Sequence, residues 1–160
     1  MSGKDQIEKS SKPNSLNFDV VIVGAGFAGM YMLHRMRGMG LKAIVFEAGD
    51  GVGGTWYWNR YPGARCDVES VQYSYQFDKE LEQEWTWSEK YSPQPEILKY
   101  ANHVADRFNL RKDIVFNTRI ESTTYNEEKG EWGVVTGTGD AYQSDFCIFA
   151  TGCLSSFNLP

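Results

Sequence analysis

Cysteine, histidine and proline are scarce in this chain, and it contains no Cys-x-x-Cys spacing. Its three cysteines are Cys66, Cys147 and Cys153. An odd number of cysteines without paired spacing argues against a disulfide framework, so we expect reduced thiols in a cytoplasmic protein. No metal site is expected either, because no cluster of metal-ligating residues stands out in the sequence.

The chain also lacks a basic stripe and a long apolar run. Its net charge is −5, and its 16 lysines and arginines are scattered, so we expect no nucleic-acid partner. The most apolar stretch, 20–33, is interrupted by three glycines and is shorter than the roughly 20 residues that a membrane helix needs. We therefore expect no membrane span, and no cleavage site for a targeting signal follows this stretch.

What is present fits one α/β domain. The 160 residues are 41% hydrophobic, which is ordinary for a globular protein. Residues 1–17 are polar and without periodicity, so we expect a disordered tail, with the domain covering 18–160. The β-branched run 18–23 predicts a buried parallel strand, 28–39 predicts a helix, and 42–46 predicts a second strand. Strand, helix and strand within about 30 residues form a βαβ unit.

The rest of the chain alternates between irregular and regular segments. Residues 47–93 are aromatic and rich in glycine, with little periodicity, and predict a long functional loop. A helix over 95–109 and a third parallel strand over 114–116 follow. The segments 119–125, 132–136 and 142–149 predict an antiparallel meander. The expected fold is therefore a Rossmann-like parallel sheet with an antiparallel β-meander.

Three glycines after the first strand form the pattern G-x-G-x-x-G, which has meaning because it joins a strand to a helix. Gly24 permits the tight turn, Gly26 lets the backbone approach a pyrophosphate, and Gly29 lets the helix pack on the strand. The start of the helix offers unpaired N–H groups to the anion. The pattern predicts a dinucleotide site.

An acidic residue ends the second strand, where it would accept hydrogen bonds from an adenosine ribose. This residue, Glu47, follows Gly29 by 18 positions and would repel a 2′-phosphate, which favours FAD or NAD over NADP. The alternative is a structural turn with a surface glutamate. Downstream, Gly53–Trp56 would contact an extended cofactor such as FAD, or would only form a flexible loop.

The stretch G-V-G-G-T-W-Y-W-N-R-Y-P-G-A-R-C-D-V-E-S, residues 51–70, resembles the N-terminal part of Baeyer–Villiger monooxygenases. The resemblance covers about 19–160 and includes A-T-G at 150–152. It implies that Arg65, Cys66 and Asp67 contact NADP. The residues that it implies for FAD are Gly24, Gly26, Phe27, Ala28, Gly29, Glu47, Gly54, Thr55, Trp56, Asp67, Tyr73, Ile120, Thr151, Gly152 and Cys153.

The resemblance also assigns roles along the cofactor. It places Glu47 at the adenosine ribose, the backbone of Ile120 at the adenine, and Asp67 and Tyr73 beside the flavin, with Asp67 in a supporting catalytic role. From the residues alone, Asp67 could equally cap a loop, and Arg65 could form a surface salt bridge. Cys66 has no nearby histidine and is expected to pack in the interior.

In that family NADPH reduces FAD, and the reduced flavin captures oxygen as a flavin peroxide that converts a ketone to an ester or lactone. The sequence contains one dinucleotide motif where the family has two. We therefore interpret it as a fragment of a longer enzyme, inactive alone, whose unfinished sheet promotes association. Two alternatives are an N-hydroxylating or sulfur-oxidising flavin monooxygenase, disfavoured by the Trp-rich segment 55–67, and a stand-alone FAD-binding module without catalysis.

Overall fold

A computed structural model of the chain describes residues 16–154. The predicted disordered tail 1–17 therefore lies outside the described residues, except for its last two positions. There the prediction is wrong, because the first strand begins at Leu16 rather than Phe18. Leu16 and Asn17 pair in parallel register with Tyr142 and Gln143, so hydrogen bonds to a distant strand extend the element beyond its apolar core.

One mixed sheet of six strands organises the domain, in the order β3-β2-β1-β6-β5-β4. β1 is parallel to its neighbours β2 and β6, and β2 is parallel to β3. β5 is antiparallel to its neighbours β4 and β6. Strand β6 therefore belongs to both the predicted parallel sheet and the predicted meander. The strands are β1 (Leu16–Val23), β2 (Ala43–Phe46), β3 (Ile114–Val115), β4 (Ile120–Asn126), β5 (Glu131–Thr136) and β6 (Ala141–Phe149).

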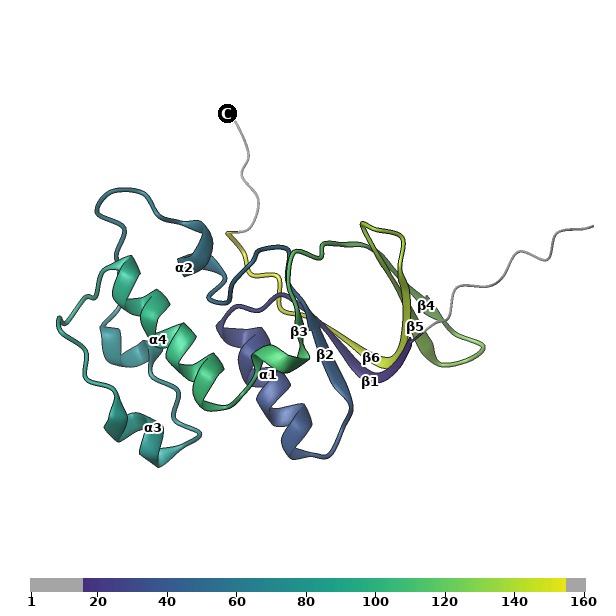
Figure 1. The fold of residues 1–160 in the computed structure, drawn as a ribbon, viewed down its shortest axis with the longest axis horizontal. Coiled ribbons are helices and arrows are strands. Elements are labelled where there is room, and N and C mark those ends of the chain that lie inside the picture. The colour runs from purple at the N-terminus through teal and green to yellow at the C-terminus, as the bar shows by residue number, and fades with distance from the viewer. Residues whose placement is uncertain (1–15, 155–160) are drawn as a thin grey trace, which may run out of the picture.

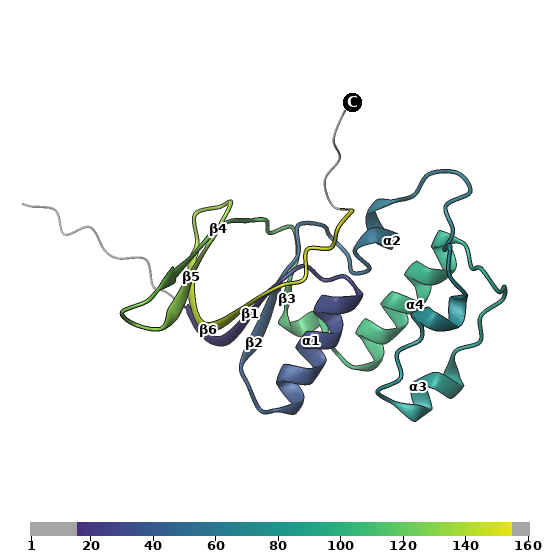
Figure 2. The ribbon, with the colours of Figure 1, turned by 180° about the vertical axis from the view of Figure 1, so that it is seen from behind.

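The helices gather on one side of the molecule and the meander on the other (Figures 1 and 2). No helix within residues 16–154 is long and apolar enough to cross a membrane. The helices are α1 (Phe27–Gly38), α2 (Thr55–Trp58), α3 (Lys79–Glu84) and α4 (Gln94–Arg107), with 3-10 turns η1 (Ser70–Tyr73) and η2 (Arg111–Asp113).

The parallel strands β1 and β2 are buried on both faces, as their continuous apolar sequences predict. On one face, Val20 and Ile22 pack with residues of α1 and α4, and both are fully buried. On the other face, Val21 and Phe46 pack against Val134 of β5. The meander thus takes the place of a second helical layer over this face.

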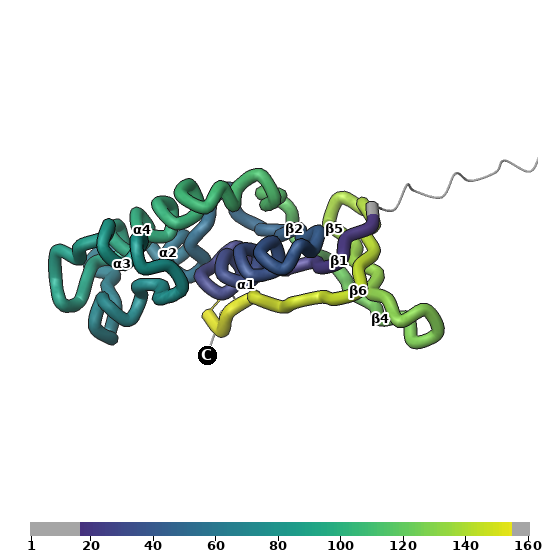
Figure 3. The backbone as a smooth tube through the Cα atoms, turned by 90° about the horizontal axis from the view of Figure 1, so that it is seen from below, coloured from purple at the N-terminus to yellow at the C-terminus, as the bar shows by residue number. Residues whose placement is uncertain are grey.

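Strand β6 keeps an open apolar flank beside this core. Phe146 is paired with Val20 in the sheet, yet its side chain is 60% exposed, and Phe149 is 54% exposed. In the tube view α1 runs along the sheet, in which β6 lies between β1 and β5 (Figure 3). This flank is the surface that the expected association would use.

Helix α3 departs from the prediction that 47–93 forms a loop with little periodicity. Its signal is an N-cap: the Asp78 carboxylate accepts a 2.8 Å hydrogen bond from the N–H of Leu81. Leu81 is then buried against Tyr100 and Val104 of α4. The segment is nevertheless irregular over most of its length, and that part of the prediction holds.

Candidate nucleotide-binding site

A cavity of about 890 Å³ lies where the parallel strands β1, β2 and β6 end. Val23, Phe46 and Phe149, the last residues of these three strands, all line it. Ligands of open α/β sheets bind at this edge, beside the point where the chain connections change direction. In Figure 1 the segment that follows β6 approaches α2, and residues of both segments line the cavity.

The glycine turn between β1 and α1 leaves no room for side chains at two positions. Gly24 has φ of +102°, and a Cβ there would lie 2.7 Å from the carbonyl oxygen of Ala150. A Cβ on Gly29 would lie 1.8 Å from the carbonyl oxygen of Gly24. Gly24 therefore lets the turn lie against the end of β6, and Gly29 allows the close packing of strand and helix that the motif predicts.

The second glycine has an additional reason. The Cα hydrogen of Gly26 that a side chain would replace faces Gly54, and a Cβ there would lie 3.4 Å from the Gly54 Cα. Gly54 has φ of +56°, and its own Cβ would lie 2.9 Å from the Gly26 Cα. The two glycine loops touch, and the N–H of Gly53 donates to the carbonyl of Ala25 at 3.0 Å. Gly26 thus lets the loop after β1 pack against the loop before α2, and both loops line the cavity.

The start of α1 is open toward this cavity. Its N-cap is Gly26, no side chain among the described residues caps it, and its first turn carries no acidic residue. Phe27 and Ala28 line the cavity. Because the first N–H groups of a helix have no partner within it and carry partial positive charge, this end suits an anion.

Glu47, at the end of β2, reaches across to the glycine turn and is 5% exposed. Its Oε2 accepts a 2.7 Å hydrogen bond from the N–H of Ala25, and its Oε1 accepts one of 2.8 Å from Gly49. A carboxylate has about four acceptor sites, so two remain for the hydroxyls of a ribose. The acid therefore stabilises the turn and lines the cavity at once.

Helix α2 contributes aromatic and hydroxyl groups to the cavity lining. Thr55 and Trp56 line the cavity, and the buried side-chain amide of Gln94 donates to the carbonyl of Trp56. The ring of Tyr73 meets that of Trp56 edge-on at 5.6 Å. Burial raises the pKa of Tyr73, so its hydroxyl stays protonated at neutral pH.

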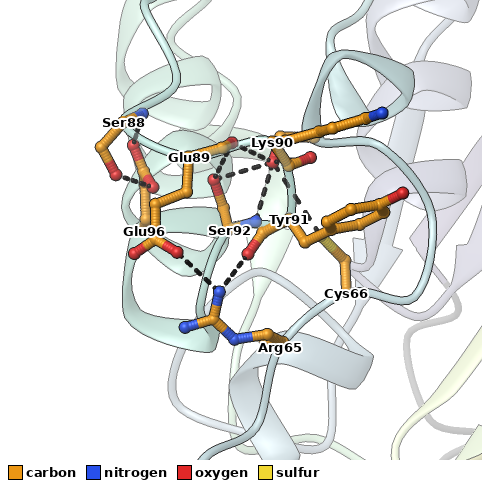
Figure 4. Close-up of polar contacts among 9 residues, drawn as sticks. Arg65, Cys66, Ser88, Glu89, Lys90, Tyr91, Ser92 and Glu96 are labelled. Atoms are coloured by element: carbon orange, nitrogen blue, oxygen red, sulfur yellow. Dashed lines mark hydrogen bonds and ion pairs between the residues drawn. The ribbon is translucent and has the colours of Figure 1, made fainter.

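The segment that the resemblance assigns to NADP lies outside this cavity and is fastened to the turn before α4 (Figure 4). Arg65 pairs with Glu89 at 2.7 Å and donates to the carbonyl of Tyr91 at 2.6 Å. Ser70 and Ser92 are buried and share a 2.9 Å hydrogen bond between their hydroxyls. Arg65 thus forms the surface salt bridge that the residues alone allowed.

Cys66 is 4% exposed and packs with Trp56 and Ile97, which agrees with an interior role. Asp67 is exposed, and its side chain has no hydrogen bond or ion pair with another described residue. The roles of Arg65, Cys66 and Asp67 toward NADP stay predictions.

The structure brings most of the predicted FAD residues to one cavity and leaves others outside it. Gly29, Asp67 and Cys153 do not line it. Gly29 acts through packing. The predicted residues that do line it are Gly24, Gly26, Phe27, Ala28, Glu47, Gly54, Thr55, Trp56, Tyr73, Ile120, Thr151 and Gly152.

Sequence reasoning did not find several polar lining residues. Arg119 begins the predicted strand 119–125 and directly precedes the observed β4, and no motif gave it a role in binding. Gln72 and Ser74 flank Tyr73 at the end of η1. His34 and His103 do not line the cavity, and His34 stacks on Phe77 with ring centroids 4.4 Å apart.

Residues 22–100 match the family described as NAD(P)-binding Rossmann-like domain. The chain is 46% identical over 145 residues to a phenazine N-monooxygenase of Lysobacter antibioticus, and 43% identical over 146 residues to a cyclohexanone 1,2-monooxygenase of an Acinetobacter species. These alignments cover 90% and 91% of this chain and 27% of each relative.

Among solved structures, an oxidised steroid monooxygenase bound to NADP aligns with a TM-score of 0.87 and 60% identity. The alignment covers 90% of this chain and 28% of that one. The chain therefore spans little more than a quarter of the proteins it matches. Over about nine-tenths of its length, it is a homologue of the N-terminal portion of Baeyer–Villiger monooxygenases.

Proposed function

We propose that this chain binds FAD in the cavity at the ends of β1, β2 and β6. The observation that carries the proposal is the junction of Glu47 with the glycine turn, because it puts a carboxylate beside the open start of α1. A nucleotide needs both: N–H groups for its diphosphate and an acceptor for its ribose.

The residues present fit that cofactor. The glycine backbones at Gly24 and Gly54 adopt conformations that side chains rarely allow, and they keep the cavity wall close to the main chain. The cavity volume of about 890 Å³ lies within the range of cofactor sites. A second wall from α2 supports a ligand that extends beyond the diphosphate, which favours FAD over a mononucleotide.

We further propose that the chain forms the FAD-binding part of an NADPH-using Baeyer–Villiger monooxygenase that acts on a ketone and oxygen. Bound FAD would supply electron transfer and oxygen activation. The chain's own residues would bind the diphosphate at α1, orient the ribose at Glu47, and shield the ring end with Trp56 and Tyr73. The three cysteines are free thiols, which supports a cytoplasmic location.

A second candidate activity is oxidation of a ring nitrogen. The relatives include both a phenazine N-monooxygenase and a cyclohexanone monooxygenase at similar identity. Likeness over this stretch therefore supports nitrogen oxidation as well as carbonyl oxidation. Comparing ketones with aromatic N-heterocycles as substrates of an enzyme that carries this chain would decide.

The direct test is the visible spectrum of the purified chain after incubation with FAD and removal of unbound cofactor. A retained flavin band, lost in Glu47→Ala, supports the proposal. A colourless folded chain at saturating FAD would overturn it. The chain alone is expected to form no ester from ketone, NADPH and oxygen, and a lactone yield from it would refute that expectation.

A further inference from the structure

Among the described residues that line the cavity, Arg119 is the one positively charged side chain and Glu47 the one negatively charged. We propose that Arg119 binds the adenylate half of the nucleotide, an inference that rests on the proposed function. The ligand class is a purine nucleotide, recognised by a guanidinium at the ribose end of the cavity.

Hydrogen bonds hold the backbone just before Arg119 against the backbone at Glu47 and Gly49. The N–H of Thr118 donates to the carbonyl of Glu47 at 2.8 Å, and the N–H of Asn117 donates to that of Gly49 at 2.9 Å. On the other side, the carbonyl of Arg119 accepts a 2.8 Å hydrogen bond from Gly137. The exposed side chain of Arg119 therefore starts from a backbone position that is hydrogen-bonded, through Thr118, to the backbone of Glu47.

The guanidinium of Arg119 also has no hydrogen bond or ion pair within residues 16–154. Arg37, Arg60, Arg65, Arg107 and Arg111 each hold a hydrogen-bond partner. Arg119 and Arg35 have no side-chain hydrogen bond or ion pair within residues 16–154. A planar guanidinium without a partner can stack on a purine and attract its phosphates.

The negative charge of the chain gives a reason for a cationic side chain at this cavity. The chain carries a net charge of −5, and Glu47 adds a carboxylate beside the diphosphate. An acidic protein repels a dianionic ligand unless positive groups face it locally. The start of α1 supplies partial charge, and Arg119 is the full charge that the cavity offers.

The test compares Arg119→Gln with Arg35→Gln in the full chain. Arg35 is a matched control, because it is exposed, lacks a described partner, and lies near the far end of α1. We expect Arg119→Gln to weaken FAD and ADP about tenfold in calorimetric titrations, and Arg35→Gln to leave both within twofold. Arg119→Glu is expected to bind more weakly than Arg119→Gln.

Several outcomes overturn the inference. It fails if Arg119→Gln binds ADP as tightly as the unaltered chain, or if Arg119→Glu binds no more weakly than Arg119→Gln. It also fails if only adenosine 2′,5′-bisphosphate loses affinity, because Arg119 would then recognise a 2′-phosphate. If the unaltered chain binds neither FAD nor ADP, the proposed function itself is wrong.

Discussion

The carboxylate of Glu47 and the backbone N–H of Ala25 are joined by a 2.7 Å hydrogen bond across 22 residues of sequence. Ala25 lies inside the glycine turn and is fully buried. The bond joins the glycine turn before α1 to the acid at the end of β2. We therefore expect the glycine turn and the proposed ribose site to form together.

Glu47→Gln tests this coupling. The amide nitrogen of glutamine must face the N–H of either Ala25 or Gly49, which leaves a buried donor unpaired. We expect the free energy of unfolding to fall by about 1–3 kcal/mol in urea denaturation, and FAD affinity to fall with it. Glu121→Gln, at an exposed site on β4, is the control and should change neither. Equal stability of Glu47→Gln and the control would contradict the coupling.

Two glycines of α1 should respond to alanine in opposite directions. Gly29→Ala places a Cβ 1.8 Å from the Gly24 carbonyl, so we expect a loss of at least about 3 kcal/mol or failure to fold. Gly38→Ala meets nothing within 4 Å at the end of the same helix and should stabilise by about 0.5–1 kcal/mol. Thermal unfolding measures both. Similar melting temperatures for the two variants would refute the packing role of Gly29.

His34 predicts a dependence of stability on pH. Burial, followed by Arg37 and Arg35, lowers its pKa in the folded state, while Asp78 opposes the shift. The unfolded chain therefore binds the proton more tightly, and the free energy of unfolding falls as the pH drops from about 7 to 5.5. His34→Phe keeps the ring contacts with Phe77 and Phe108 without titrating. It should show a smaller loss over that range, and the same loss as the unaltered chain would disprove the assignment.

The open flank of β6 should drive association of the chain. Phe146 presents a side chain that is 60% exposed beside the core of the sheet. We expect concentration-dependent association in sedimentation velocity, reduced in Phe146→Ser. Val71→Ser removes an equally exposed apolar group from η1 and should leave association unchanged. A monomeric unaltered chain at every concentration would contradict this expectation.

The sequence predicts the βαβ unit well because the two features that indicate it are local in the chain. The run of β-branched residues in β1 and the glycines at fixed spacing each act within a few residues. The hydrogen-bond partners of the Glu47 carboxylate cannot be predicted in this way. Its spacing from Gly29 predicts a ribose ligand, but only the fold shows that Ala25 and Gly49 occupy two of its acceptor sites.

Long-range contacts account for what the sequence did not reveal. The fastening of Arg65 to Glu89 and of Ser70 to Ser92 joins segments about 20 residues apart that share no periodicity. Arg119 enters the cavity because β4 begins beside the turn that follows β2, a placement set by tertiary structure. A single charged residue between two strands carries no pattern from which its neighbourhood could be inferred.

The central claim is that the start of α1 and the carboxylate of Glu47 together receive FAD. Amide chemical-shift mapping of the isotopically labelled chain during FAD titration tests it most directly. The account predicts the largest shifts at Ala25, Phe27, Ala28 and Gly49, with smaller ones along α2. Shifts confined to residues outside the cavity, or none at saturating FAD, would contradict it.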